Sequence, residues 1–452
     1  MSFRPTRRTI LGSVAATLVD LPLARAQAPT PSDPRVLEVR PGEIALQGEG
    51  AKTSAFTYDG TVPGPLLRAK AGEEVRLRLV NKLNQPTSLH WHGLRGFNAV
   101  DGVGDLTQKP VAPGQDFDIA FKATDPGFLL YRPAALPHSP EQIAKGLAGV
   151  LIVDEPQPPD VDAEHMLLFQ DWTLDGKGAV AGPFDTSPLE GRIGTLLTAT
   201  GKTVPFSVTA VPGARVRLRI GNAASARIMI VAFDGVRPKI IAIDGQPCDP
   251  FEPVRLTIPI APGARFDLLM DLPKEENKQA KLILRDPMQA SPDRDLATWT
   301  VKGAAAKTRP PIASLPLNPL LPAEIRLGQA KKLELTLEPP KAGAKDARWT
   351  IGGKARSYAD KPLLSVPRGT PVSIGFTNKS SVAVPMCVHG HAVRLLHDLD
   401  DGWEPYWRNG VIVPPGRAKH VAFLADTPGK WALRSDIVDQ EAAGLSAWFE
   451  VT

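Results

Sequence analysis

Two histidines spaced two residues apart are the residues of this sequence best suited to metal chemistry. His90, Trp91 and His92 stand in a row and are followed by Gly93. On a strand, side chains at positions i and i+2 project to one face, so both imidazoles can reach one metal ion or two adjacent ions. Neutral imidazole is the commonest metal ligand in proteins. The pattern therefore predicts a strand that presents two metal ligands.

The elements that position these histidines belong to an internal repeat. Three segments alternate apolar and polar residues after a glycine and end in asparagine, at residues 72–81, 213–222 and 369–378. Such alternation predicts a strand, and asparagine suits the turn that ends it. Each copy is followed by a Pro-Gly turn that opens another strand, at 113–114, 262–263 and 415–416.

Three copies of this pattern predict three tandem all-β units of about 130–150 residues, each a β-sandwich. Pro-rich stretches at 154–159 and 307–311 mark the boundaries. We expect domains at residues 27–155, 160–303 and 312–452. Cys248 and Cys387 lie in different repeats, so we expect free thiols, with a disulfide between them as the alternative. Two cysteines also exclude an iron–sulfur cluster or a zinc site with four cysteine ligands.

The first 26 residues predict an export signal. Arg7 and Arg8 precede a short apolar stretch that ends in the small-x-small sequence Ala24-Arg25-Ala26. This order is typical of a cleaved signal peptide, and the paired arginines resemble a twin-arginine signal. An ordinary secretory signal is the alternative. We expect the mature protein in the periplasm, where removal of the signal lowers its formal net charge from +5 to +2.

The remaining composition excludes several partners. The small positive charge is not collected into basic blocks, so nucleic-acid binding is not expected. In the expected mature chain, no apolar run reaches the roughly 18 residues that a membrane span needs. We expect a monomer that can bind other periplasmic proteins.

Five motifs resemble the three-domain multicopper oxidases, a superfamily that includes laccases: residues 61–65, 90–94, 101–102, 146–149 and 388–391. The resemblance runs from about residue 35 to the C-terminus. It implies three tandem cupredoxin-like Greek-key β-sandwich domains. In that family, four His-x-His elements hold a trinuclear copper cluster between domains 1 and 3. A cysteine, two histidines and usually a methionine hold a type 1 copper.

Carried over position by position, these ligands match only in part. His90 matches a type 2 ligand, His92 and His389 match type 3 ligands, and Cys387 stands at the second type 2 position. The resemblance marks eight further positions as former copper ligands that are now non-ligating: Arg132, Ala134, Val384, Arg434, Ser435, Asp436, Gln440 and Leu445. Without the cysteine thiolate and its imidazole partners, a blue copper site cannot form. A full four-copper set is therefore not expected.

Two of the replacements predict a different centre. Arg132 and Arg434 are permanently charged and cannot be ligands. We predict that they take the place of the missing cations and pair with Asp436, because a buried charge needs a partner. A distance from Asp436 of more than about 4 Å for both arginines would contradict this prediction.

The surviving ligand positions leave two interpretations open. His90, His92, His389 and Cys387 are expected to meet where the first and third domains join. They could hold one copper or zinc ion, since three nitrogen or sulfur ligands plus water can bind either metal. Alternatively, they are hydrogen-bonded interface residues. The other histidines are expected to be ordinary polar residues: His138, His165, His391, His397 and His420.

Four functions follow from these alternatives. The favoured one is a non-catalytic binding or scaffold protein of the cell envelope. It resembles the copper-free cell-division protein of bacterial periplasms that shares three cupredoxin domains. The others are a copper-dependent, laccase-like oxidoreductase, a metal-binding or metal-delivery protein, and an enzyme of another class that uses Asp101 and Asp436 for acid–base work. No catalytic residue is assigned.

Overall fold

A computed structural model gives the fold and describes residues 33–48, 50–184, 189–286, 292–341, 348–397 and 402–452. The chain separates into two compact units, Met1–Asp33 and Pro34–Thr452, and every described helix and strand lies in the second. The predicted signal at residues 1–26 lies outside the described residues. Within the described ranges, no helix is both long and apolar enough to cross a membrane.

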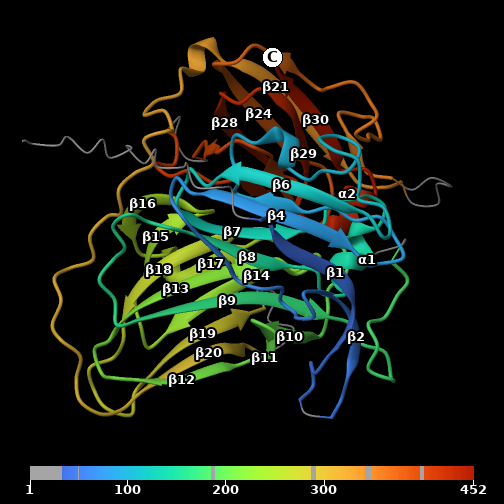
Figure 1. The fold of residues 1–452 in the computed structure, drawn as a ribbon. Coiled ribbons are helices and arrows are strands. Elements are labelled where there is room, and N and C mark those ends of the chain that lie inside the picture. The colour runs from blue at the N-terminus through green and yellow to red at the C-terminus, as the bar shows by residue number, and fades with distance from the viewer. Residues whose placement is uncertain (1–32, 49, 185–188, 287–291, 342–347, 398–401) are drawn as a thin grey trace, which may run out of the picture. The chain divides into compact units, whose positions relative to one another are not determined.

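Strands dominate the second unit. The two α-helices of the described residues, α1 (Ser139–Ala144) and α2 (Val438–Ala442), are only six and five residues long. Three pairs of sheets follow one another along the chain, coloured blue to cyan, green to yellow and orange to red in Figure 1. This order confirms the predicted all-β fold of three tandem sandwiches.

The first sandwich carries the predicted histidine strand. One sheet has the order β2 (Thr53–Tyr58), β1 (Arg35–Ile44), β4 (Glu74–Asn81), β6 (Asp116–Lys122). The second has the order β3 (Leu67–Lys70), β8 (Gly149–Asp154), β7 (Gly127–Arg132), β5 (His90–His92). One hydrophobic cluster draws residues from both sheets. The buried strand β5 ends the second sheet, which places its histidines at the margin of the sandwich.

The second sandwich is the largest. Its seven-stranded sheet has the order β11 (Lys202–Thr203), β10 (Leu196–Ala199), β9 (Ala163–Trp172), β13 (Arg215–Asn222), β18 (Arg265–Asp271), β15 (Lys239–Ile243), β16 (Gln246–Phe251). The facing sheet has the order β12 (Phe206–Ala210), β20 (Arg294–Val301), β19 (Gln279–Arg285), β14 (Met229–Asp234), β17 (Thr257–Ile260).

The third sandwich carries the other predicted site residues. One sheet has the order β22 (Thr350–Ile351), β21 (Lys331–Glu338), β24 (Thr370–Asn378), β28 (Ala418–Ala425), β26 (Arg394–Leu395). The other has the order β23 (Ser365–Val366), β30 (Ser446–Val451), β29 (Gly429–Ser435), β25 (Val384–Val388), β27 (Gly410–Val413). Three short 3-10 turns complete the described elements: η1 (Asn98–Val100), η2 (Val254–Leu256) and η3 (Leu327–Gln329).

The asparagine that ends each repeat makes the same contacts three times. The side-chain amide of Asn81 donates to the backbone oxygens of Gln85 and Val111, and its oxygen accepts from the backbone of Leu83. Asn222 and Asn378 make the equivalent three bonds in the second and third sandwiches. Each asparagine therefore fastens the end of its strand to a neighbouring loop, as its turn chemistry predicts.

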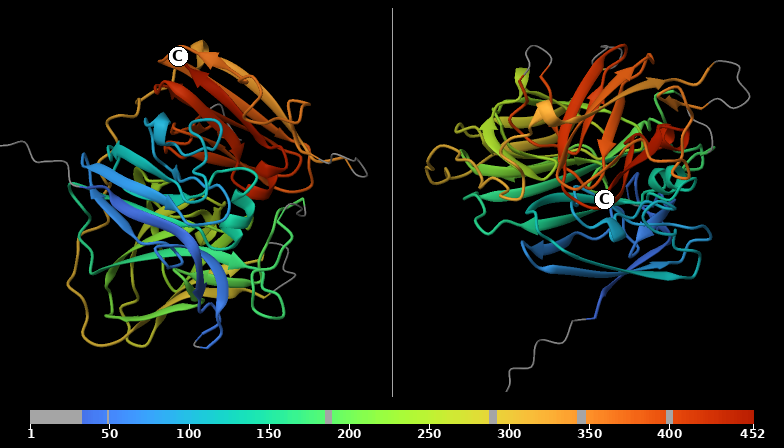
Figure 2. Two further views of the ribbon diagram at one scale, coloured as in Figure 1. Left: turned by 45° about the vertical axis from the view of Figure 1, so that its right-hand side comes forward. Right: turned by 90° about the horizontal axis from the view of Figure 1, so that it is seen from above.

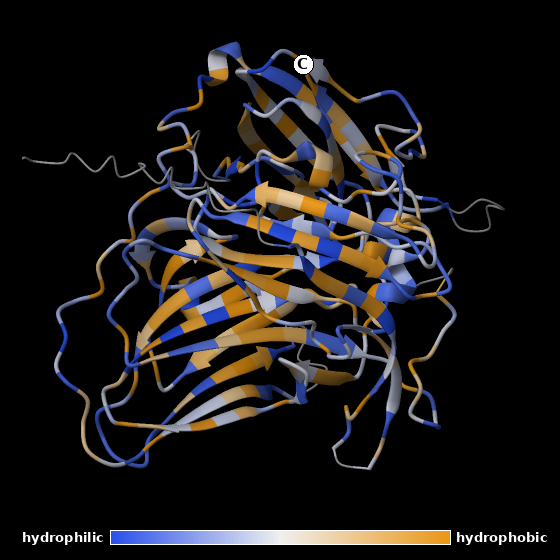
Figure 3. Cartoon of the chain, viewed as in Figure 1, coloured by the Kyte–Doolittle hydropathy of each residue, from blue (hydrophilic) through white to orange (hydrophobic). Residues whose placement is uncertain are grey.

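The alternation read from the sequence is visible along the strands. Orange and blue stripes follow one another on several strands in Figure 3, and the apolar side chains gather in one large cluster per sandwich. The third sandwich lies against the first in both views of Figure 2. At this junction the Asn98 side chain of the first sandwich donates to the backbone oxygen of Lys430 in the third. The predicted site residues lie at this junction.

Candidate metal centre

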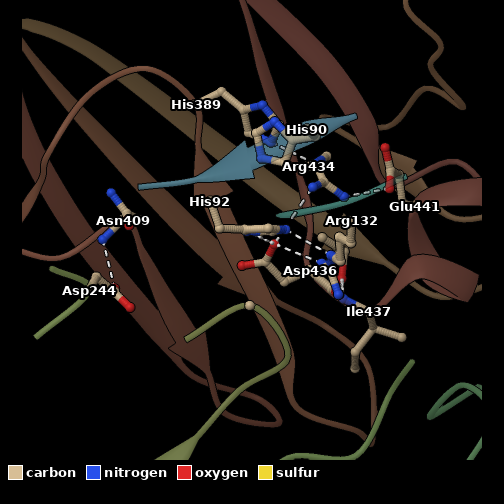
Figure 4. Close-up of polar contacts among 12 residues, drawn as sticks. His90, His92, Arg132, Asp244, His389, Asn409, Arg434, Asp436, Ile437 and Glu441 are labelled. Carbon is tan, nitrogen blue, oxygen red and sulfur yellow. Dashed lines mark hydrogen bonds and ion pairs between the residues drawn. The ribbon is translucent and has the colours of Figure 1, made fainter. Parts of the chain in front are cut away.

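Side chains from the first and third sandwiches meet in one buried group, shown in Figure 4. Strand β5 supplies His90 and His92, and His389 follows β25 directly. Arg132 ends β7, and Arg434 lies on β29. All five side chains are buried.

Strand register explains why the two arginines enter this group. In the first sandwich, β5 and β7 run antiparallel and pair His90 with Arg132. In the third sandwich, β25 and β29 pair Cys387 with Arg434. Each arginine therefore lies across a strand pair from a predicted ligand position.

Each arginine donates a hydrogen bond to a histidine. Arg132 Nε lies 2.7 Å from His92 Nε2, and Arg434 Nε lies 2.7 Å from His389 Nε2. A guanidinium has donors only, so each Nε2 must accept with its lone pair. The neutral imidazole then carries its proton on Nδ1, and for His389 that Nδ1 lies 3.0 Å from Asp101 Oδ2.

Buried carboxylates balance the two guanidinium groups. Asp436 Oδ1 lies 3.4 Å from Arg132 Nη2 and 4.0 Å from Arg434 Nη2, which confirms the predicted pairing. Glu441, on α2, accepts from Arg434 Nη1 at 2.6 Å and from the Tyr358 hydroxyl at 2.7 Å. No sequence motif pointed to Glu441 or Tyr358, although Glu441 is the nearer carboxylate of Arg434.

Asp101 connects two stacked imidazoles. The rings of His90 and His389 lie 4.1 Å apart between centroids, with an interplanar angle of 17°. His90 Nδ1 lies 2.7 Å from the backbone oxygen of Asp101 and 3.3 Å from its Oδ1. Burial alone would raise the pKa of Asp101, but His389 and His90 outweigh it and hold that pKa below its usual range. Asp101 is buried and occupied by both imidazoles, so it is poorly placed for acid–base work on a substrate.

Two histidines of the centre, His92 and His389, resist protonation. Burial lowers the pKa of His92 well below its usual value, and Arg132 and His90 lower it further. Burial and His90 lower the pKa of His389 to about 3, although Asp101 opposes them. Both imidazoles are therefore neutral at neutral pH, as their contacts with the arginines require.

The predicted residual ligands divide into two triplets. His90, Asp101 and His389 form one, and His92, Cys387 and Asp436 form the other, with ligand atoms within 4.8 Å of one another in each. Cys387 and Cys248 are both buried free thiols, as expected. Burial, Asp436 and Asp244 raise the pKa of Cys387, against the opposing effect of the arginines, so its thiol stays protonated.

A small pocket reaches the second triplet. It has a volume of about 60 Å³, and its lining includes His92, Asp436, Asn409 and Gly263. A methyl group on Gly263 would come within 2.8 Å of His92 Nδ1. This nitrogen therefore faces a close backbone wall that only glycine can form.

Arg265, which the sequence analysis also missed, joins all three sandwiches beside this pocket. Its Nε donates to the Phe128 oxygen of the first sandwich at 2.7 Å. One Nη donates to the Asp244 oxygen of the second at 2.9 Å and to Asn409 Oδ1 of the third at 2.6 Å. Such a convergence depends on the packing of distant strands and leaves no local pattern in the sequence.

The positions that the resemblance assigns to type 1 copper hold a different kind of core. Val384 and Leu445 belong to the hydrophobic cluster of the third sandwich. Ser435 Oγ donates to Gln440 Oε1 at 2.9 Å, and Gln440 Nε2 donates to the Leu189 oxygen at 3.1 Å. Ala134 is buried in a separate apolar cluster.

Comparison with known proteins places the chain in a family. Multicopper oxidase models match residues 38–158, 163–282 and 330–452. Lac15, from a marine microbial metagenome, is 30% identical, and the match covers 92% of this chain and all of that one, with a TM-score of 0.75. The chain belongs to the multicopper oxidase superfamily.

Two further multicopper oxidases support this assignment. Multicopper oxidase MmcO of Mycobacterium tuberculosis is 28% identical over 494 residues, which cover 98% of this chain and 91% of that protein. The structure of a multi-copper oxidase from Pseudomonas thermotolerans is 28% identical, with a TM-score of 0.79 over 92% of this chain and 99% of that one. The three sandwiches are therefore cupredoxin-like domains.

The superfamily implies copper, and the described side chains do not fit a full copper set. A copper ligand must offer a lone pair, yet the Nε2 lone pairs of His92 and His389 already accept from arginines. At the type 1 positions, Val384, Ser435, Gln440 and Leu445 supply no thiolate and no imidazole. Soft sulfur and nitrogen ligands define that site, so no electron-transfer step can be derived through it.

Proposed function

We propose that this multicopper oxidase superfamily member acts without copper, as a non-catalytic binding or scaffold protein of the bacterial periplasm. The observation that carries the proposal is the closed type 1 position, where Gln440 bonds to Ser435 and to the Leu189 oxygen. An oxidase of this superfamily needs a metal there to accept electrons from its substrate. Hydrogen-bonded and apolar side chains cannot perform that step.

The proposed location rests on the N-terminal sequence. Residues 1–26 have the order of a cleaved signal peptide and contain paired arginines. The twin-arginine route would place the mature chain in the periplasm. A role in the cell envelope, such as support of cell division, fits a three-domain protein whose described side chains at the type 1 position offer no thiolate and no imidazole.

A copper-loading experiment tests the proposal. The mature chain is expressed with copper, purified and assayed for metal content and for oxidation of a phenol, with MmcO treated in parallel as the positive control. We expect no oxidase activity and no visible absorption from a blue copper site. Turnover of the phenol with a full copper complement would refute the proposal.

A binding role makes a second measurement possible. The tagged mature chain is expressed in the periplasm of its source organism, crosslinked in place and purified, and the captured proteins are identified by mass spectrometry. A scaffold should capture the same envelope proteins when His92 and His389 are both replaced by asparagine, because binding uses the surface. Loss of these proteins from the folded double variant would instead favour a metal-dependent function.

The second triplet favours one alternative function, a mononuclear metal-binding protein. His92, Cys387 and Asp436 offer nitrogen, sulfur and oxygen ligands beside a pocket with room for water. Binding would require His92 to release its Nδ1 proton and Cys387 to become a thiolate. One metal ion per chain, lost in the Cys387→Ser variant, would support this alternative over the copper-independent proposal.

A further inference from the structure

We infer that Arg132 and Arg434 are the resident cations of the centre, two guanidinium groups that stand in place of metal ions and tie the first and third sandwiches together. The inference deepens the proposed copper-independent function, on which it rests. It assigns the centre a structural ligand set that the chain itself supplies.

The hydrogen bonds give each arginine a metal-like position. A type 3 copper would be held by imidazole nitrogens, and here Arg132 Nε and Arg434 Nε each lie 2.7 Å from an imidazole Nε2. Each guanidinium consumes the lone pair that a metal would need. The two guanidinium atoms that make no hydrogen bond to the described residues, Arg132 Nη1 and Arg434 Nη2, are donors and offer a metal nothing.

The charges of the centre require these cations. Asp101, Asp436 and Glu441 are buried carboxylates, and the neutral imidazoles of His92 and His389 supply no positive charge to balance them. Removal of both arginines would leave Asp436 and Glu441 buried without a counter-charge, which is strongly unfavourable.

Both guanidinium groups remain charged in this environment. Burial and the neighbouring Arg434 lower the pKa of Arg132 to about 10, although Asp436 opposes them, which still leaves it cationic at neutral pH. Burial also acts to lower the pKa of Arg434, but Glu441 and Asp436 outweigh it and raise that pKa above its usual value.

Arg132 joins the first and third sandwiches directly, and Arg434 acts on the same junction through His389. Arg132 belongs to the first sandwich, and its Nη2 donates to the backbone oxygen of Asp436 in the third at 3.1 Å. In return, His389 of the third sandwich donates to Asp101 of the first. Arg434 orients His389 for that bond. The junction is therefore closed without a metal.

A nuclear magnetic resonance experiment on the unaltered mature protein tests the assignment directly. With arginine and histidine labelled with nitrogen-15 in a deuterated chain, scalar coupling across a hydrogen bond connects Arg Nε to His Nε2. We expect two such couplings, from two neutral histidines that carry their proton on Nδ1. A proton on Nε2 of His92 or of His389, or the absence of either coupling, would overturn the inference.

Metal titration supplies an independent readout. Copper, zinc and a chelator should each leave the melting temperature of the unaltered protein unchanged. In the R132H/R434H double variant, the bound metal content should instead rise from background to about one ion per chain, because four imidazoles match the ligand number that zinc prefers. R394H is the matched control, since Arg394 stacks over Trp407 away from the centre. R394H should bind no additional metal.

The outcomes separate the two proposals. The unaltered protein could bind a metal ion, lose the couplings on loading and still oxidise no phenol. In that case the resident-cation inference fails, but the proposal of a non-catalytic function stands, with a bound metal ion. If the protein oxidises the phenol, both fail. If the double variant does not fold, the couplings in the unaltered protein still decide the matter.

Discussion

Replacement of Arg434 by methionine tests the energetics of the centre most sharply. Arg434 and Glu441 are both about 1% exposed, and Arg434 Nη1 lies 2.6 Å from Glu441 Oε2. In R434M the long apolar side chain keeps much of the packing volume, but Glu441 loses its counter-charge and His389 Nε2 loses its donor. The variant therefore isolates the charge and the hydrogen bonds.

The magnitude follows from the burial of the pair. Breaking a buried ion pair by removal of one partner costs about 3–5 kcal/mol, because the remaining charge is left uncompensated. The Tyr358 hydroxyl still donates to Glu441 and offsets part of this loss. We expect R434M to lower the free energy of unfolding by about 3 kcal/mol. Because E441Q removes the stranded charge, R434M/E441Q should be more stable than R434M, with a coupling energy of about 1–3 kcal/mol.

Urea unfolding followed by tryptophan fluorescence measures all three variants against the parent. The matched control is R237M, since Arg237 also pairs with a glutamate at 2.7 Å but its side chain is 73% exposed. An exposed pair contributes about 0–1 kcal/mol, so R237M should be close to the parent. If R434M were no more destabilising than R237M, or if E441Q gave no recovery, Arg434 would not be acting as a buried counter-cation.

Three further perturbations have defined outcomes. The folded-state pKa of His389 is about 3 and its unfolded value is about 6.5, so the unfolded chain binds more protons in acid. Protonation of this histidine alone should therefore lower the free energy of unfolding by about 2 kcal/mol as the pH falls from about 6.5 to about 5. An unchanged urea midpoint across that range would contradict this prediction. R265M leaves buried oxygens of Phe128 and Asp244 without a donor and should destabilise the junction of the three sandwiches by about 1–3 kcal/mol, seen as faster limited proteolysis between them. R217M/R219M removes both guanidinium groups that pair with the buried carboxylate of Asp267 and should lower the free energy of unfolding in urea by about 3–5 kcal/mol; a loss of less than about 1 kcal/mol, the range of exposed pairs, would show that the network is solvated.

Local chemistry explains which parts of the fold could be predicted. Alternation and turn residues act over a few positions, so the repeats located strands β4, β13 and β24 together with Asn81, Asn222 and Asn378. The resemblance to the multicopper oxidases, carried over position by position, located Arg132 and Arg434 in the centre. These residues are defined by their distance along the chain from a recognisable motif. Strand register then fixes which residues these arginines face in the folded protein.

Partners drawn from distant strands could not be predicted in this way. Alternation places Arg217 and Arg219 on the polar side of β13, yet both side chains are only 1% exposed and contact Glu155 and Asp267. In the first copy of the repeat, the side chain of Arg76 is 35% exposed. Glu155, between the first two sandwiches, accounts for part of the difference, because this connecting segment lies over β13. The sequence pattern is alike in both copies and does not reveal which other segment of the chain covers each strand.

The contacts of Glu441 indicate that the centre is organised around arginine and did not simply lose its copper ligands. A site that had only lost ligands would have no need of a buried carboxylate with both oxygens occupied. Here Oε2 accepts from Arg434 and Oε1 accepts from Tyr358, deep within the third sandwich. Replacement of Arg434 by histidine alone would therefore leave Glu441 buried without its guanidinium partner, a cost that E441Q removes. R434H should accordingly be less stable than R434H/E441Q in urea, and the reverse order would remove the reason for assigning Glu441 to the arginine.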